Sequence, residues 1–105
     1  MGIRRLIGLG PKTQVTIHAA GNKFRLHKNG MVEVNKKPAC PFADLPILYQ
    51  QDLVEASFLK AIRKARGNQS IPDYIEQDME GLVRSAVERP DKEDTFQRVF
   101  NTFSQ

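Results

Sequence analysis

Residues 12–35 read KTQVTIHAAGNKFRLHKNGMVEVN, and apolar and polar side chains alternate through them with a period of two. This alternation is typical of β-strands that bury one face and expose the other. Two pairs of Gly and Asn, at positions 21–22 and 29–30, divide the stretch at points where hairpin turns are expected. The stretch therefore predicts a three-stranded antiparallel meander with one apolar face and one cationic face.

The first turn can be placed because directly opposed residues must share a face of the sheet. A two-residue turn at Gly21-Asn22 places Ile17 opposite Leu26. Both side chains are apolar, so this register satisfies the condition, and we expect the first hairpin to turn there.

The second turn needs one more residue. A two-residue Asn29-Gly30 turn would oppose Leu26 and Glu33, which belong on different faces. A three-residue loop over 28–30 removes the conflict and puts glycine at the last, left-handed position that such loops favour. The opposed pairs are then Leu26 with Val32, Phe24 with Val34, and Arg25 with Glu33.

Three helices are expected in residues 44–105. The first begins at Asp44, a good N-cap, and ends near Arg66, before a Gly-Asn pair. The second has a capping-box-like start at Ser70 and ends at Arg89, before a proline. The third starts in the Asp- and Glu-rich segment that follows.

Each of the last two helices has an apolar stripe at helical spacing. The stripe of the second helix is Ile71, Ile75, Met79, Leu82, Val83 and Ala86. The stripe of the third helix is Phe96, Val99, Phe100 and Phe103. Because so short a helix is marginal alone, these phenylalanines must pack on another surface.

The order of these segments predicts one α+β domain over residues 1–105, with the N-terminal three-stranded meander packed against two to three C-terminal helices. Its expected parts are an N-terminal arm (1–11), the meander (12–35), a Pro-rich extended connector (36–43) and a helical part (44–105). The connector contains two prolines, which exclude a helix interior or an inner strand.

Charge is unevenly distributed along the chain. Residues 1–37 hold eight Lys and Arg against Glu33 alone, a net charge of +7. Residues 38–105 hold eight basic and eleven acidic residues, a net charge of −3. A chain with a basic and an acidic half can steer head-to-tail or heteromeric contacts.

The cationic face of the predicted sheet is a candidate surface for nucleic acid or for an acidic protein. Its expected residues are Lys23, Arg25, His27, Lys28, Lys36 and Lys37. Phosphates are bound by such side chains, but single-strand recognition also uses aromatic rings, and the sequence places none on this face. Nucleic acid is therefore the alternative, and a solvated face or one that contacts protein is favoured.

Candidate catalytic and metal-binding residues are few. Cys40 is the only thiol, and His18 or His27 could act as its base only if the connector folded over the polar face. A two-His metal site would need Glu33, which we expect to pair with Arg25 across the strands. The sequence thus predicts no catalytic site, no metal, no cofactor and no enzymatic activity.

Apolar residues near both ends, and surplus apolar surface on the first helix, indicate docking. The predicted protein-interface residues are Ile3, Leu6, Ile7, Leu9, Tyr49, Leu53, Phe96, Phe100 and Phe103. We expect a non-catalytic structural subunit of a larger multiprotein particle, for example a phage virion or a head–tail or tail component, as a homo- or hetero-oligomer.

The expected location is the cytoplasm or a virion or other large assembly. Gly10, Pro11 and Lys12 end the N-terminal apolar stretch too early for a cleaved signal peptide. No apolar run approaches the roughly 20 residues that span a bilayer, so no membrane insertion is expected.

Overall fold

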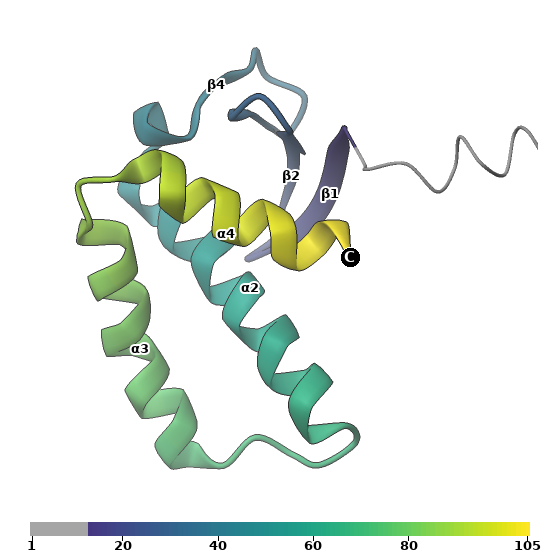
Figure 1. The fold of residues 1–105 in the computed structure, drawn as a ribbon, viewed down its shortest axis with the longest axis vertical. Helices are drawn as coiled ribbons and strands as arrows, with labels where there is room; N and C mark the ends of the chain where they lie inside the picture. Colours follow the sequence, from purple (N-terminus) through teal and green to yellow (C-terminus); the bar gives the residue numbers. More distant parts are fainter. Residues whose placement is uncertain (1–12) are drawn as a thin grey trace, which may run out of the picture.

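The computed structural model describes residues 13–105, which form a four-stranded antiparallel sheet against three helices (Figure 1). The strands are β1 (Gln14–Ala19), β2 (Asn22–His27), β3 (Met31–Val34) and β4 (Cys40–Pro41), in the order β1-β2-β3-β4. The α+β class is confirmed, and the sheet has one strand more than predicted. The expected N-terminal arm, 1–11, lies outside the described residues.

The second hairpin has the predicted register. Phe24 faces Val34, and Leu26 faces Val32. Gly30 closes the three-residue loop with φ 97°, a conformation that glycine adopts without steric cost. Its N–H donates to the carbonyl of His27 at 2.9 Å.

The pairing register of the first hairpin differs from the prediction by two residues. Its turn is at Ala20-Gly21, so that Ile17 faces Phe24 instead of Leu26. Both turn residues have positive φ, 52° and 79°, as a type I′ turn requires. Because side chains repeat with period two, a two-residue shift leaves every one of them on its predicted face.

The shift makes Asn22 the first residue of β2 instead of a turn residue. Its side-chain oxygen accepts a hydrogen bond from Asn35 Nδ2 at 2.9 Å. Asn35 Oδ1 in turn accepts from the backbone N–H of Lys23 at 2.9 Å. These bonds join the start of β2 to the end of β3, and they stabilise the shifted turn.

The predicted connector contains the fourth strand. Cys40 pairs with Val32, and Pro41 pairs with Met31. Pro41 is tolerated because β4 is an edge strand, where a missing N–H need not break a ladder. A 3-10 helix, η1 (Phe42–Asp44), follows directly.

The helices are α2 (Ile47–Arg66), α3 (Asp73–Glu88) and α4 (Lys92–Ser104). The expected N-cap at Asp44 was wrong: the N-cap of α2 is Pro46, because the residue before a proline is held extended. For the same reason α3 begins after Pro72, and no side chain caps it, so the capping box at Ser70 does not form.

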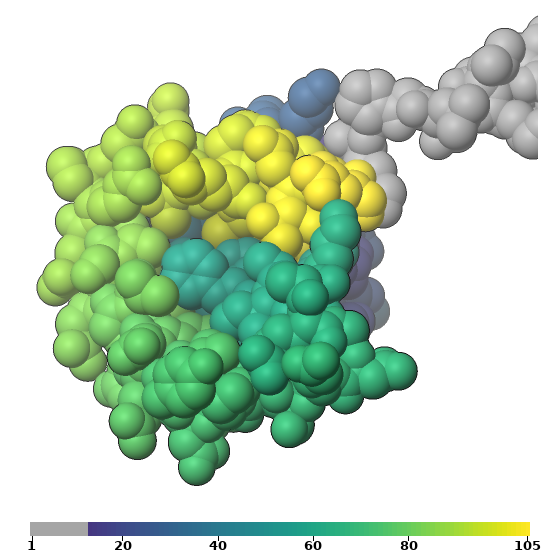
Figure 2. Space-filling view, turned by 60° about the horizontal axis from the view of Figure 1, so that its bottom comes forward, coloured from purple at the N-terminus to yellow at the C-terminus, as the bar shows by residue number. Residues whose placement is uncertain are grey.

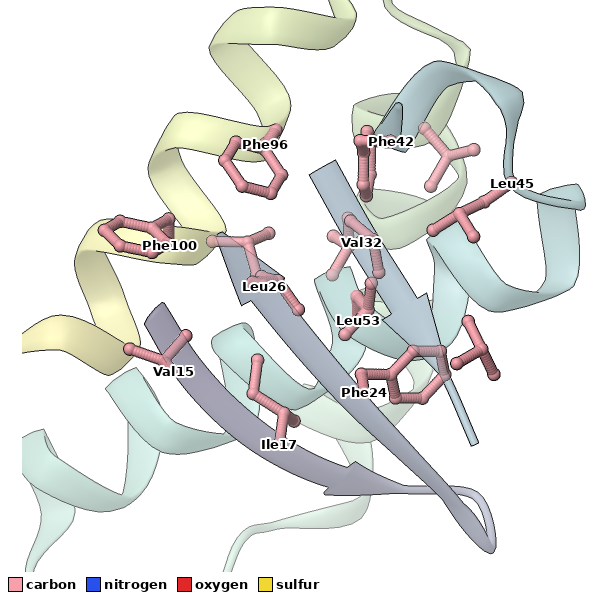
Figure 3. Packing of buried hydrophobic residues seen from close by; sticks show 14 of the residues in the cluster. Val15, Ile17, Phe24, Leu26, Val32, Phe42, Leu45, Leu53, Phe96 and Phe100 are labelled. Carbon is pink, nitrogen blue, oxygen red and sulfur yellow. The ribbon is translucent and has the colours of Figure 1, made fainter. Parts of the chain in front are cut away.

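The core lies between one face of the sheet and the helices, as Figure 3 shows. Phe24 and Leu26 of β2 are fully buried and face α2 and α4. The predicted stripe of α3 was wrong at Leu82, which is 59% exposed, while Val87 is 2% exposed. The stripe thus follows Met79, Val83 and Val87, the i, i+4, i+8 row that faces the core.

A buried polar cluster joins the ends of several elements. Gln50 of α2 is 1% exposed, and its amide donates to the carbonyls of Leu45 at 2.9 Å and Ala43 at 3.3 Å. Its side-chain oxygen accepts from Lys92 Nζ at 3.1 Å, and Lys92 also donates to the carbonyl of Val87. The cluster fixes η1, α2, the end of α3 and the start of α4 to one another.

Candidate protein-docking site

The outer edge of β1 has no strand beside it within residues 13–105. In antiparallel pairs, hydrogen-bonded and non-hydrogen-bonded positions alternate. Lys28 N donates to Thr13 O at 2.8 Å, which makes 13 a bonded position and, by alternation, also 15, 17 and 19. Gln14, Thr16 and His18 therefore direct their backbone N–H and C=O groups away from β2, toward the outer edge of the sheet.

A groove of about 440 Å³ runs beside this edge, between β1, α2 and the end of α4. In Figure 2, the purple of β1 is visible beside the teal of α2 and the yellow end of α4. Its apolar lining is Ile17, Ala19, Ala20, Ala56, Leu59 and Phe103. We call this combination of unpaired strand edge and apolar lining the β1 groove.

Phe103 is half-buried at the mouth of the β1 groove. The ammonium group of Lys60 lies 4.9 Å from the centroid of its ring. A cation over an aromatic face is attractive, so this contact helps to hold the ring against α2. Phe103 of α4 and Lys60 of α2 thus line this side of the groove together.

Charges of both signs line the groove on α2. Asp52 and Glu55 come first along the helix, and Lys60 and Arg63 follow about two turns later. Burial raises the pKa of the Asp52 carboxyl above its usual value, because desolvation disfavours the charged form. An occupant with a cation near Asp52 would relieve that penalty.

The predicted cationic face is the side of the sheet that α2 and α4 do not cover (Figure 1). Lys23, Arg25 and His27 all lie on it, as alternate residues of β2. Lys28 is exposed in the loop after β2, whereas Lys36 and Lys37 are exposed at the opposite end, after β3. Lys23, at the start of β2, lies next to the end of β3, where the N–H of Asn35 donates to its carbonyl at 2.8 Å.

The expected ion pair between Arg25 and Glu33 was wrong. The two residues are direct partners in the ladder, but Glu33 Oε2 lies 2.5 Å from His27 Nε2 instead. Arg25 Nε is buried and has no hydrogen-bond partner in the described part of the chain. Glu33 and His27 reach each other diagonally across β2 and β3, which cross-strand geometry allows for long side chains.

The chemistry-bearing residues are not brought together. Cys40 pairs with Val32 and packs against the core, so it is on the face opposite His18 and His27. Across residues 13–105, no group of three or more His, Cys, Asp or Glu side chains could hold a metal ion.

The structure places the predicted interface residues in three settings. Leu53, Phe96 and Phe100 are buried in the chain's own core, so their assignment to a partner surface was wrong. Tyr49 is half-buried with its ring against Phe24, 5.7 Å between centroids. Phe103 lines the β1 groove. The remaining four, Ile3, Leu6, Ile7 and Leu9, lie outside the described residues.

Sequence analysis missed the α2 side of the groove. In the sequence, Leu59 belongs to the broad apolar arc of the first helix, and Ala56 belongs to a second apolar patch with Tyr49 and Leu53. Nothing in their spacing separates a groove wall from core. The available signal was strand order, because the first strand of a meander is always at an edge of its sheet.

Comparison with protein-family models, with curated proteins and with solved structures found no match to this chain. In the part of the chain that the structure describes, no helix combines the length and apolar character needed to cross a bilayer.

Proposed function

We propose that this chain is a non-catalytic subunit of a larger protein assembly, such as a virion or a phage head–tail or tail structure, and that it docks through its N-terminal arm and the β1 groove. The observation that carries the proposal is the unpaired edge of β1 above an apolar groove. An extended segment can pair with such an edge through its backbone, while the groove receives alternate side chains.

The two edges of the sheet differ in a way that supports this use of β1. Edge strands are usually kept from pairing by short length, charge or proline. β4 has two residues and includes Pro41. β1 has six residues, and those with outward-facing backbone groups are Gln14, Thr16 and His18, none a Lys or a proline. Within residues 13–105, nothing pairs with the edge at β1.

Deletion of residues 1–10 is expected to abolish incorporation into the assembly and to leave the domain folded. Residues 13–105 form a buried core among themselves, so we expect the free energy of unfolding to change by less than about 1 kcal/mol. Native mass spectrometry of complexes from the source measures incorporation, and urea unfolding measures stability.

A matched control keeps the arm at full length and replaces Ile3, Leu6, Ile7 and Leu9 by serine. It should fail to incorporate as well, because the proposal assigns docking to those side chains. Normal incorporation of the truncated chain would show that the arm is not a docking element.

A second candidate function is binding of nucleic acid by the open sheet face. Lys23 and Arg25 lie on that face, and neither forms an ion pair within residues 13–105. Glu33, the acidic residue among the four described strands, is already in contact with His27. These side chains could contact phosphates.

A salt titration with duplex DNA and with single-stranded RNA separates the two functions. If the face only contacts protein or solvent, no binding is expected even at low salt. If it binds phosphate, affinity falls with salt by a log–log slope of about −0.9 per phosphate on duplex DNA. The variant Lys23→Glu with Arg25→Glu should then lose both the affinity and the slope, and Lys64→Glu with Arg84→Glu, on exposed helix surfaces, is the control.

A further inference from the structure

We propose that the β1 groove of one copy of this chain receives residues 3–9 of the arm of a second copy, which add a strand to the edge of β1. This inference rests on the proposed function and names the partner. It makes the contact head-to-tail: each copy offers an arm and a groove, and the two surfaces are different.

The length of the arm suits the edge. Seven extended residues span about 23 Å at 3.3 Å per residue, and the six residues of β1 span about 20 Å. Such a strand would meet the three outward-facing positions of β1, at Gln14, Thr16 and His18. It would satisfy backbone groups that nothing else in residues 13–105 pairs.

The side-chain pattern of the arm suits the groove. In an extended strand, Ile3, Ile7 and Leu9 lie on one side together with Arg5. On the same side the groove offers the apolar surfaces of Ala56, Leu59 and Phe103. Three apolar side chains would thus be buried for each added strand.

The charges of the arm and of the β1 groove favour one direction of the added strand. Arg5 is the charged residue on the groove side of the extended arm, and the groove carries the acidic pair Asp52 and Glu55 at one end of its α2 wall. Lys60 and Arg63 at the other end repel the arm in the reverse orientation. The electrostatic pattern therefore favours one orientation of the added strand.

The arm of the same chain is a poorer occupant because of the residues that would form the turn. If the arm paired with β1 of its own chain and turned Ile7 and Leu9 toward the groove, the loop between arm and strand would need an odd number of residues. The three-residue loop would consist of Gly10, Pro11 and Lys12. A three-residue hairpin loop favours a residue in the left-handed backbone conformation at its last position, and here that residue is Lys12. Pro11 would occupy the second central position of a type I turn, where proline is disfavoured.

Even-length loops fail for a different reason. A two-residue loop at Pro11-Lys12 needs positive φ at proline, whose ring holds φ near −65°. Any even loop also places Ile7 and Leu9 on the polar face with Thr16 and His18. The arm of a second copy reaches β1 without a turn between the two strands. Repeated head-to-tail contacts between copies close into rings or grow into filaments.

Disulfide trapping between two copies tests the proposal. In a Cys40→Ala background, one chain carries Ile7→Cys and a size tag, and the other carries Ala56→Cys. Mixed under mild oxidation, the two should form a disulfide between chains of different size. With Ser85→Cys in place of Ala56→Cys, on the exposed side of α3, no such product is expected.

Two results would overturn the proposal. The first is an intrachain disulfide in a chain that carries both cysteines, with no mixed product, which would place the arm in its own groove. The second is the absence of both products. If arm deletion still prevents incorporation in either case, the arm remains a docking element of a larger assembly, and only the pairing of the arm with the β1 groove of a second copy is wrong.

A backbone variant gives an independent measurement. Thr16→Pro removes an N–H that points away from β2, so the ladder within the sheet is retained while the edge loses a donor. Thr16→Val keeps the N–H and is the control. We expect the proline variant to be monomeric by light scattering and the valine variant to assemble like the parent chain. Equal assembly of the two would contradict strand addition at this edge.

Discussion

Truncation of Phe24 to alanine is expected to lower the free energy of unfolding by about 3–5 kcal/mol, the range for large core aromatics. Phe24 is completely buried in β2, and its ring meets Tyr49 of α2 edge-on with 5.7 Å between centroids. The substitution removes both the apolar burial and the aromatic pair, and it leaves a cavity between sheet and helix. No other side chain occupies that position.

Urea unfolding followed by circular dichroism measures this loss. Phe24→Leu keeps most of the volume and should cost clearly less than the alanine variant. Tyr74→Ala is the surface control, because Tyr74 is 64% exposed and its truncation should change stability by about 0.5 kcal/mol or less. A cost below about 1 kcal/mol for Phe24→Ala would show that β2 and α2 do not pack as described.

Replacement of Gln50 by leucine is expected to cost on the order of 2–4 kcal/mol, although it makes the core more apolar. The amide donates to the carbonyls of Ala43 and Leu45 and accepts from Lys92. Leucine matches its size but leaves these groups without that partner, and each buried unsatisfied group costs about 1–3 kcal/mol.

A double-mutant cycle isolates this cluster. Because Gln50 and Lys92 are in direct contact, the double variant Gln50→Leu with Lys92→Met should cost less than the sum of the single changes. Gln77→Leu, at an exposed position of α3, is the control and should be nearly neutral. Additive costs in the cycle would mean that the two side chains do not act together.

The two hairpins show how far local sequence specifies a sheet. The second was predicted residue by residue, because only a three-residue loop reconciles Gly30 with the pairing of Leu26 and Val32. The first was predicted on the right faces and two residues out of register. Period-two alternation fixes the face of a side chain, but a shift of two positions satisfies it equally. The hydrogen bond between Asn22 and Asn35, thirteen residues apart, contributes to that choice.

The candidate site was predictable only in part. An amphipathic stripe such as Phe96, Phe100 and Phe103 shows that a surface must be covered, but not what covers it. In the structure the first two pack on the chain's own sheet, and the third lines the β1 groove. Likewise Arg25 and Glu33 were correctly placed opposite each other, yet His27 contacts the carboxylate, because side-chain reach decides among near neighbours.

The sequence by itself determined the α+β class, the faces of the first three strands and the C-terminal ends of α2 and α3. These follow from local periodicity and from the restricted backbones of glycine and proline, which act over a few residues. Tertiary structure decided the register of the first hairpin, the fourth strand, the buried Gln50–Lys92 cluster and the groove beside β1. Each of these depends on residues distant in the chain, whose meeting is set by packing of the whole domain.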